Sequence, residues 1–310
     1  MATTQEQPRR GGAIEMYQAE LKRVPASVST LLSEYSHIPL DQQKEHIKTI
    51  RDQAYKSHPY PCLGRWRFLE LDLADHPLYH SDILPALKSG SNSEQATWKF
   101  LDLGCCLAQD VRKLAFDGAD LSRLYGADLR PEFIDMGYAL FRDEDKLPRD
   151  HFIAPADVFD LSPETELSQK CDGTVGILQA SAVFHLFDLS QQKAMAQRCL
   201  KLLDPSRKRV LMCGAQVGNI NPSEYPRRSG GGSRFRHDED SWREMWKEVV
   251  GQGEWKEKIR DVEVHAVMTQ HVSGERREGE MVEEGNKHFG SIEEGFRWMR
   301  WWVWVEFAES

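Results

Sequence analysis

The chain has 310 residues, of which 40% are hydrophobic, and its formal net charge is −9. This length suits one large domain or a domain with an added segment, and the hydrophobic content is enough to build a core. The acidic balance argues against nucleic acid as a partner, because neutralisation of phosphates supplies most of that affinity. The one basic stretch, residues 226–236, is short and interrupted by glycines, as is typical of a solvated loop.

The cysteine pattern and the absence of a long apolar run indicate where the protein resides. None of the six cysteines shows the Cys-x-x-Cys spacing of a zinc site. Cys105 and Cys106 are adjacent and are expected to be reduced thiols, which fits a reducing compartment. We expect residues 1–12 to be a polar, disordered tail without a signal core. The most apolar run, residues 298–307, is too short to span a bilayer. We expect a cytoplasmic protein without a membrane span or a metal, and the sequence leaves a homodimer open.

The N-terminal part of the chain is predicted to be helical. Apolar residues recur at helical spacing over residues 13–24 and 41–56, and Asp41 is suited to capping the second helix. Residues 59–90 combine prolines with aromatics, which indicates loops and short helices wrapped over a core. A polar linker over residues 89–94 leads into the first strand.

Two apolar segments that contain acids indicate a nucleotide-binding βαβ unit. Residues 99–103 predict a buried strand that contains Asp102 and enters a turn at Gly104, and residues 125–129 predict a second strand that contains Asp128. The helix after the first strand directs its N-terminus at the ligand, and Asp128 can accept hydrogen bonds from ribose hydroxyls. The turn has one glycine and no basic residue, so it suits a ligand without phosphates, of which S-adenosylmethionine (SAM) is the common one. Strand-end capping is the alternative role for both acids.

The next elements continue the alternation of strands and helices. A helix is predicted over residues 131–141, with Pro131 in its first turn, and strands over residues 152–159, 172–180 and 209–215. Three successive strands end near an acid at one edge of the sheet. This placement matches the site expected where the strand order of an open α/β sheet reverses.

The last part of the chain is predicted to close the sheet. Residues 218–240 form a long Gly/Pro/Arg loop, which indicates a functional lid or disorder. An amphipathic helix with a serine cap is predicted over residues 241–250, and the final strands over residues 262–272 and 298–307. The charged segment over residues 274–285 is expected to be an exposed hairpin extension.

This order of elements resembles a class I SAM-dependent methyltransferase, and particular motifs carry a closer resemblance. The motifs are residues 100–114, 117–118, 125–128, 132–143, 184–187, 235–237 and 241–242. They resemble fungal O-methyltransferases of meroterpenoid pathways (the austinol, terretonin and andrastin type), a group understood to esterify a carboxylic acid of a farnesylated polyketide. The resemblance runs from about Tyr60 to Trp255. Cys106 and Ala108 replace two glycines of the broad methyltransferase motif. A cysteine pair at this turn is nevertheless typical of the group that the chain resembles.

The resemblance implies an α/β fold that is Rossmann-like, with a seven-stranded, mostly parallel sheet and helices on both faces. It also implies a division of the chain. Residues 13–95 would form a helical N-terminal cover or lid, and residues 96–310 would form the SAM-binding methyltransferase core.

The resemblance also implies a set of cofactor-binding residues. They are Asp102, Gly104, Cys105, Asp128, Leu129, Asp157 and Val158. By position, Asp102 and Gly104 face the methionine end of SAM, and Asp128 holds the ribose hydroxyls. Leu129 lies against adenine, whose amino group donates to Asp157. A purely structural role remains the alternative, most of all for Asp157.

The acceptor determines what the catalytic site must supply. Methyl transfer from a sulfonium is an in-line displacement, so positioning carries much of the rate enhancement. A carboxylate acceptor is already ionised at pH 7, since its reference pKa is near ~4, whereas a phenol or alcohol needs a base, usually His. His185 follows the fourth strand and is either that base or a neutral orienting donor, unless it only packs beside its helix. Tyr60, Phe68, Arg234 and Arg236 are candidate substrate-binding residues.

We therefore expect a SAM-dependent O-methyltransferase of fungal secondary metabolism. Its expected acceptor is a hydrophobic small molecule, a meroterpenoid carboxylic acid converted into its methyl ester. A methyltransferase-like fold that acts as a non-methylating cyclase or binding protein is the main alternative. A protein-methylating regulator is a third hypothesis, and the acidic chain weighs against it.

Overall fold

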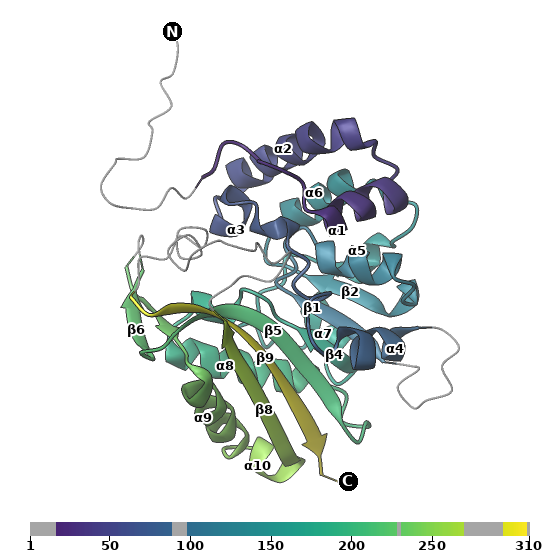
Figure 1. Ribbon diagram of the computed structural model, residues 1–310. Helices are drawn as coiled ribbons and strands as arrows, with labels where there is room; N and C mark the ends of the chain where they lie inside the picture. The colour runs from purple at the N-terminus through teal and green to yellow at the C-terminus, as the bar shows by residue number, and fades with distance from the viewer. Residues whose placement is uncertain (1–16, 89–97, 228–230, 270–293, 309–310) are drawn as a thin grey trace.

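The computed structural model describes residues 17–88, 98–227, 231–269 and 294–308. Within these ranges, a seven-stranded sheet carries helices on both faces, and a group of N-terminal helices lies beside it (Figure 1). The expected tail over residues 1–12, the linker over residues 89–94 and the extension over residues 274–285 lie outside the described residues.

The main sheet has the strand order β3-β2-β1-β4-β5-β9-β8. Its strands are β1 (Lys99–Leu103), β2 (Leu124–Ala127), β3 (Phe152–Ile153), β4 (Val175–Gln179), β5 (Val210–Asn219), β8 (Ile259–Thr269) and β9 (Phe296–Phe307). Strands β3, β2, β1, β4 and β5 are parallel, and β9 is antiparallel to both β5 and β8. The predicted fold, a Rossmann-like class I methyltransferase sheet, is confirmed.

The central strands are buried along almost their whole length because helices cover both faces of the sheet. All five residues of β4 and four of the five residues of β1 are buried. The chain crosses from β3 back to β4, which pairs with the other side of β1, so the strand order reverses between β1 and β4. The turns that follow these two strands therefore open a crevice at the carboxyl edge of the sheet.

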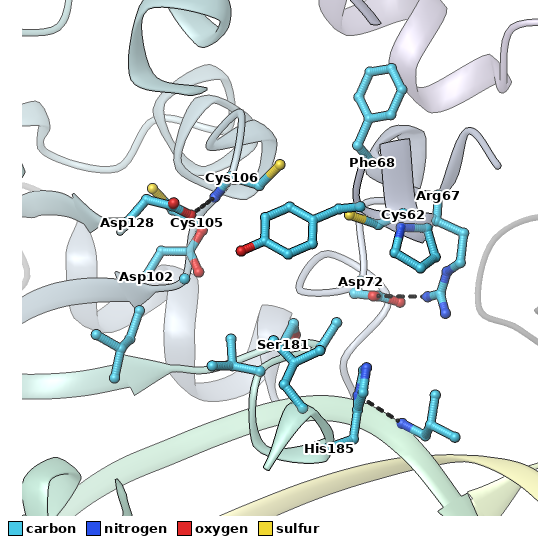
Figure 2. Close-up of a pocket in the computed structure, with 18 of the residues that line it drawn as sticks. Cys62, Arg67, Phe68, Asp72, Asp102, Cys105, Cys106, Asp128, Ser181 and His185 are labelled. Atoms are coloured by element: carbon cyan, nitrogen blue, oxygen red, sulfur yellow. Dashed lines mark hydrogen bonds and ion pairs between the residues drawn. The ribbon is translucent and has the colours of Figure 1, made fainter. Parts of the chain in front are cut away.

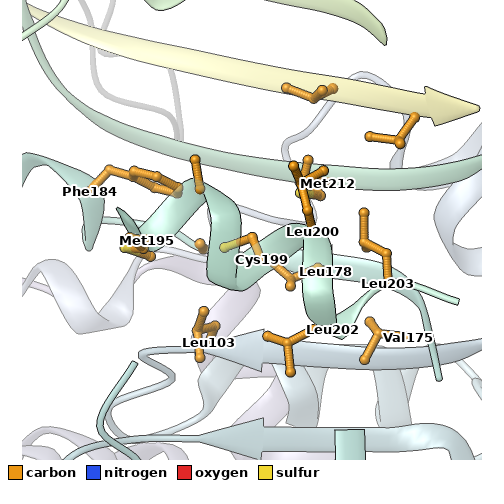
Figure 3. Close-up of a cluster of buried hydrophobic side chains, with 14 of the residues drawn as sticks. Leu103, Val175, Leu178, Phe184, Met195, Cys199, Leu200, Leu202, Leu203 and Met212 are labelled. Carbon is orange, nitrogen blue, oxygen red and sulfur yellow. The ribbon is translucent and has the colours of Figure 1, made fainter. Parts of the chain in front are cut away.

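Two hydrophobic clusters hold the helices against the sheet. The helices are α4 (Leu84–Leu87), α5 (Gln109–Phe116) and α6 (Pro131–Phe141) on one face, and α7 (Glu166–Cys171), α8 (Leu189–Leu202), α9 (Glu239–Val250) and α10 (Trp255–Lys258) on the other. Figure 3 shows the cluster on the face that carries α7 to α10. In it, Met195 and Cys199 of α8 lie over Leu178 of β4 and Met212 of β5. Short 3₁₀ turns at η5 (Leu121–Arg123), η6 (Arg149–His151) and η7 (Phe184–Leu186) connect some of these elements.

The N-terminal helices form a third cluster that packs against α6 and the turn before α5. They are α1 (Ala26–Thr30), η1 (Leu31–Tyr35), α2 (Leu40–Ser57), α3 (Pro61–Gly64) and η2 (Arg67–Leu69). The turn η3 (Tyr79–Ile83) packs instead with α4 and α5 in the cluster against the sheet. A buried ion pair reinforces the packing of the third cluster, because Arg112 of α5 donates to both oxygens of Asp143 at 2.9 and 3.2 Å. Tyr35 of η1 donates to the same carboxylate at 3.0 Å. A helical cover is thus present, and its expected limits of residues 13–95 remain a prediction.

The prediction of a helix over residues 13–24 is wrong for the described residues 17–24, which are not helical. Their carbonyl groups bind side chains of the cover instead of forming helical hydrogen bonds. Arg51 donates to the carbonyl oxygens of Gln18 and Ala19, at 3.0 and 3.3 Å, and the Trp66 indole donates to that of Glu20 at 3.1 Å. The helix predicted over residues 41–56 is confirmed as α2, although Asp41 lies in its first turn and does not cap it.

Two other predictions need correction. The segment over residues 218–240 is not a plain loop, because β6 (Ser223–Pro226) and β7 (Ser233–Arg236) pair as an antiparallel hairpin. The strand predicted over residues 152–159 ends after Ile153, since Pro155 has no N–H to donate to a ladder.

The cap of α9 also differs from the prediction. Asp238 is the N-cap of α9, and its carboxylate accepts from the Ser241 N–H at 2.8 Å. Ser241 completes the capping box as the third helical residue.

Candidate active site

A cavity of about 470 Å³ opens at the carboxyl edge of the sheet, beside the N-terminal cover. Its volume lies in the range typical of small-molecule sites. Every residue that the sequence analysis assigned to cofactor, substrate or catalysis lines this cavity. They are Tyr60, Phe68, Asp102, Gly104, Cys105, Asp128, Leu129, Asp157, Val158, His185, Arg234 and Arg236. The fold therefore brings the predicted residues together, and their individual roles remain proposals.

The turn between β1 and α5 forms one wall of the cavity. Gly104 has a φ of +79°, and a Cβ at this position would lie 2.4 Å from a methyl carbon of Val183. Only glycine fits here without a shift, because the left-handed backbone and the close approach of the segment after β4 both exclude a side chain. The N–H groups of Gly104 and Cys105 donate to the Ala127 carbonyl at 2.7 and 3.0 Å, which joins the turn to the end of β2.

Asp128 lies just past the end of β2, and two backbone groups fix its carboxylate. Oδ2 accepts from the Cys106 N–H at 2.8 Å, and Oδ1 accepts from the Arg130 N–H at 2.9 Å. Burial raises the pKa of Asp128, and these two backbone hydrogen bonds oppose that rise. A carboxylate has about four lone-pair sites, so each oxygen keeps capacity for a ligand hydroxyl.

Buried acids lie at the end of the cavity beneath this turn (Figure 2). Burial raises the pKa of Asp102 well above its usual value, and the charges of Asp110 and Asp128 raise it further. Burial also raises the pKa of Asp110 to about 7, with the charge of Asp72 as the next cause. Gln179 opposes this rise by donating to Asp110 Oδ2 at 2.9 Å. Such a cluster favours a cationic ligand, which would offset the repulsion among the acids.

At the same end of the cavity, two amide oxygens indicate that the ligand carries a hydrogen-bond donor. Gln109 and Gln179 both line the cavity, and within the described residues their buried Oε1 atoms have no hydrogen-bond partner. A buried acceptor without a partner costs free energy. The α-ammonium group of SAM could satisfy both oxygens, so the residues present fit this cofactor.

The neighbouring wall is more open and combines apolar and polar groups. Leu129 is 45% exposed, which is unusual for a leucine beside a sheet edge and suits the flat face of a base. Asp157 is exposed, and its Oδ1 accepts from the Phe159 N–H at 2.9 Å within its own turn. Its second carboxylate oxygen remains available to a ligand donor.

His185 lies in η7, on the opposite side of the cavity from Asp102 and Asp128 (Figure 2). The Val217 N–H donates to His185 Nδ1 at 3.2 Å. A neutral imidazole has one donor and one acceptor nitrogen, so the proton must be on Nε2. Burial lowers the pKa of His185 well below its usual value, and the charges of Arg236, Arg67 and Arg234 lower it further. At pH 7 the ring is neutral and presents a donor.

Three arginines lie at this end of the cavity, and one of them, Arg67, is paired with the carboxylates of Glu70 and Asp72. Arg236 of β7 is buried and donates to the His185 carbonyl at 2.6 Å, so the hairpin holds η7 in place. Arg67 of η2 lies over the Trp298 ring, 3.8 Å from its centroid, and pairs with Glu70 at 3.0 Å. Arg234 lines the same end and is half-buried.

Aromatic and aliphatic side chains also line the cavity. Phe159 and Phe187 contact each other edge to face, with ring centroids 4.9 Å apart, and both line the cavity. Phe68, Phe296 and Trp298 add further apolar surface. The cavity thus has an acidic end, a basic end and an apolar lining suited to a hydrophobic acceptor.

The sequence analysis missed several residues of the site. Among them are Cys62, Arg67, Asp72, Asp110, Gln179 and Trp298. Asp110 belongs to the motif over residues 100–114, and its position in the first turn of α5 could have indicated its place in the site. Arg67 and Trp298 had no such signal, because η2 and β9 are brought to the cavity only by the folded structure.

The described residues contain neither a metal-binding cluster nor a membrane-spanning helix. Across the part of the chain that the structure describes, no three His, Cys, Asp or Glu side chains are grouped to hold a metal ion. Of the helices among the described residues, none is long and apolar enough to cross a membrane.

Comparison with known proteins places the chain in a family. Residues 16–69 match the family described as meroterpenoid methyltransferase N-terminal domain. The O-methyltransferase phiE from Fungal sp. is 36% identical over 253 residues, which cover 81% of this chain and 80% of that protein. The asnovolin E/chermesin D methyltransferase nvfJ from Aspergillus novofumigatus is 36% identical over 74% of this chain and 78% of that protein. The chain belongs to this family of fungal methyltransferases.

The protein is accordingly a SAM-dependent methyltransferase of the fungal meroterpenoid-pathway type, as its sequence motifs predict. Among solved structures, magnesium protoporphyrin IX methyltransferase from Synechocystis PCC 6803 with bound SAH is similar at 13% identity and a TM-score of 0.42. The similarity covers 85% of this chain and 86% of that chain.

Proposed function

We propose that the protein transfers the methyl group of SAM to the carboxylate of a hydrophobic small molecule and releases a methyl ester. The observation that carries this proposal is the hydrogen bond from the Val217 N–H to His185 Nδ1. It leaves the neutral ring with only an N–H to present to the acceptor. A donor orients a carboxylate, whereas a phenol or alcohol would need an acceptor nitrogen to take its proton.

The charge distribution of the cavity supports the same acceptor. Arg67, Arg234 and Arg236 all lower the pKa of His185 through their charges, after the larger effect of burial. These arginines therefore create a positive potential around the ring. A carboxylate would be attracted to this end, while the cationic cofactor is attracted to the acids at the other.

The chain's own residues act by binding and positioning. When bound, SAM supplies a methyl group on a sulfonium sulfur. Asp102 and the oxygens of Gln109 and Gln179 would hold its ammonium end, and Asp128 would hold its ribose. His185 Nε2–H donates to one acceptor oxygen, which leaves the other oxygen free to attack. Phe68, Phe187 and Trp298 bind the apolar body and exclude water.

The names of the relatives fit this proposal. One is named an O-methyltransferase, and another is named for asnovolin E and chermesin D. For this chain we propose a meroterpenoid acid as the acceptor. A hydrophobic small molecule rather than nucleic acid is also favoured by the net charge of −9.

The test is methyl transfer from methyl-labelled SAM to a panel of terpenoid and aromatic carboxylic acids. We expect labelled products from which mild alkali releases labelled methanol, as it does from methyl esters. Labelled products that resist alkali would contradict the ester and indicate an ether. SAM binding without transfer to any acceptor class would favour the non-methylating alternative.

We also propose a cytoplasmic location. All six cysteines are free thiols in the structure, which is typical of proteins in a reducing compartment. Cell fractionation with a cytosolic marker tests this, and recovery with a membrane or secreted fraction would contradict it.

A further inference from the structure

Three consecutive carbonyl groups, those of His185, Leu186 and Phe187, lie just before the first hydrogen bond of α8. That bond is accepted one residue later, because the Gln192 N–H donates to the Asp188 carbonyl at 2.9 Å. Carbonyl groups outside a helix need a donor from another segment or from water. The orientation of residues 185–187 therefore depends on what donates to them.

The β6–β7 hairpin supplies a donor to each of these three carbonyl groups. Arg236 donates to the first at 2.6 Å, Arg227 donates to the second at 2.8 Å, and the Phe235 N–H donates to the third at 2.9 Å. The carboxylate of Glu224 in β6 also accepts from the Leu189 N–H at 3.0 Å, which joins the hairpin to the start of α8. The hairpin thus holds the backbone that carries His185.

The ring of His185 is held by a different element. The Val217 N–H of β5 donates to its Nδ1 at 3.2 Å (Figure 2). The hairpin fixes the backbone of this residue, and the sheet fixes its ring. The direction of Nε2–H is defined only when both supports are in place, since a shift of the backbone would break the hydrogen bond to the ring.

Arg227 has a position that separates support from direct contact. Its side chain is exposed, and it does not belong to the residues that line the cavity. Its Nη2 donates to the Leu186 carbonyl, its Nε donates to the Ser233 carbonyl at 3.2 Å, and its N–H donates to the Gly232 carbonyl at 3.1 Å. The guanidinium therefore joins both strands of the hairpin to η7 from outside the cavity.

We propose that Arg227 is a positioning residue for methyl transfer, which holds the Leu186 carbonyl and thereby the His185 ring in the orientation that meets the acceptor. Displacement of a positioned group by about 1 Å can lower a rate by roughly 10²-fold. The inference rests on the proposed function, in which His185 donates to the acceptor. Its tests separate the two claims.

The first test needs no acceptor and measures amide hydrogen exchange in the full chain. Arg227→Ala should speed exchange of the Val217 N–H, whose partner is the His185 ring, by at least about threefold. The Gly104 N–H, in the cofactor turn, is the internal control and should exchange as in the wild type. Unchanged exchange at Val217 would overturn the inference.

The second test measures steady-state kinetics with methyl-labelled SAM and the carboxylic acid that the panel identifies. Arg227→Ala should lower kcat about tenfold and leave the SAM affinity, measured by calorimetry, unchanged. Arg227→Lys keeps a donor and should recover part of kcat. Arg260→Ala, at an exposed position at the start of β8, is the matched control and should behave as the wild type. A parallel loss of SAM affinity in Arg227→Ala would overturn the inference.

A double variant shows whether Arg227 acts through His185. In a His185→Ala background, Arg227→Ala should change kcat by less than about twofold, because the ring that it positions is gone. No loss of kcat in Arg227→Ala, or an equal loss in both backgrounds, would overturn the inference and leave the proposed function standing. An unchanged kcat in His185→Ala alone would overturn the proposed function, and this inference with it.

Discussion

The backbone N–H of Val217 donates to Nδ1 of His185 at 3.2 Å, and this contact determines which proton the imidazole presents to the cavity. Val217 belongs to β5, and His185 lies in η7, just after β4, so the sheet itself holds the ring. With Nδ1 occupied as an acceptor, the neutral ring can only donate from Nε2. The proposed chemistry depends on this orientation.

Replacement of His185 distinguishes a role as hydrogen-bond donor from a role as general base. His185→Ala removes the proposed hydrogen bond to a charged acceptor, which is worth about 1.5–3 kcal/mol, so kcat should fall by roughly one to two orders of magnitude. Higher pH should not restore it. His185→Gln keeps an N–H donor and should retain more activity than His185→Ala in steady-state assays with the same acid. Equal activity of the two variants would show that donation is not what the ring supplies.

Replacement of Asp128 tests the cofactor half of the site. Asp128→Ala removes two backbone contacts and the proposed bonds to the ribose, so SAM affinity should weaken by about 1–3 kcal/mol. Asp157→Ala is the matched comparison, since Asp157 is exposed and its loss should cost less. Calorimetry with SAM measures both. A larger loss for Asp157→Ala than for Asp128→Ala would contradict the assignment of Asp128.

The raised pKa of Asp110 makes stability depend on pH. Burial and the charge of Asp72 raise the pKa of Asp110 to about 7 in the folded protein, and Asp75 and Asp102 also lie near it. The folded state then binds more protons than the unfolded state between about pH 4 and pH 7. The stabilising contribution is fully present below pH 4 and is lost as the pH rises through 7.

The corresponding measurement is the melting temperature from pH 5 to pH 8 in the absence of SAM. Asp110→Asn should flatten the decline with rising pH, because the side chain no longer titrates. Glu254→Gln, at an exposed position of the distant α10 region, is the control and should leave the profile unchanged. An unchanged slope in Asp110→Asn would show that another group controls the pH dependence.

Asp143 is expected to be essential for stability through its buried ion pair with Arg112 of α5. Its carboxylate and the Arg112 guanidinium are both fully buried. Removal of one partner of such a pair costs about 3–5 kcal/mol, because the other charge stays buried without compensation. Asp143→Ala should therefore unfold at much lower urea concentration, whereas Tyr35→Phe, which removes one hydrogen bond to Asp143, should cost about 1 kcal/mol. Similar urea midpoints for the two variants would contradict this estimate.

The sequence predicted those parts of the molecule that depend on local pattern. The apolar run of β1, the turn at Gly104 and the acids at the strand ends follow directly from residue order, and they lead to the strand order and the cofactor half of the site. The resemblance to the family placed His185 and the basic hairpin residues at the cavity. Local pattern also explains α2 and α9.

The features that the sequence did not predict depend on contacts between segments that are distant in the chain. Residues 17–24 have a helical apolar spacing, but Arg51 and Trp66 bind their carbonyl groups, and neither contact can be read from local sequence. The same limit applies to the His185 tautomer, which depends on Val217 in another strand. Arg67 stacks at the basic end of the cavity on Trp298, which lies more than 200 positions away in the sequence.

The pH dependence of kcat/KM with a carboxylic acid acceptor tests the central claim most directly. If His185 is a neutral donor to an ionised carboxylate, the rate should be flat from about pH 6 to pH 8, because neither group changes its protonation there. The burial of His185 and the charges of Arg236, Arg67 and Arg234 hold its pKa well below its usual value. A rate that climbs tenfold per pH unit would mean that a proton must be removed from the acceptor or from His185, and it would contradict ester formation by a neutral donor.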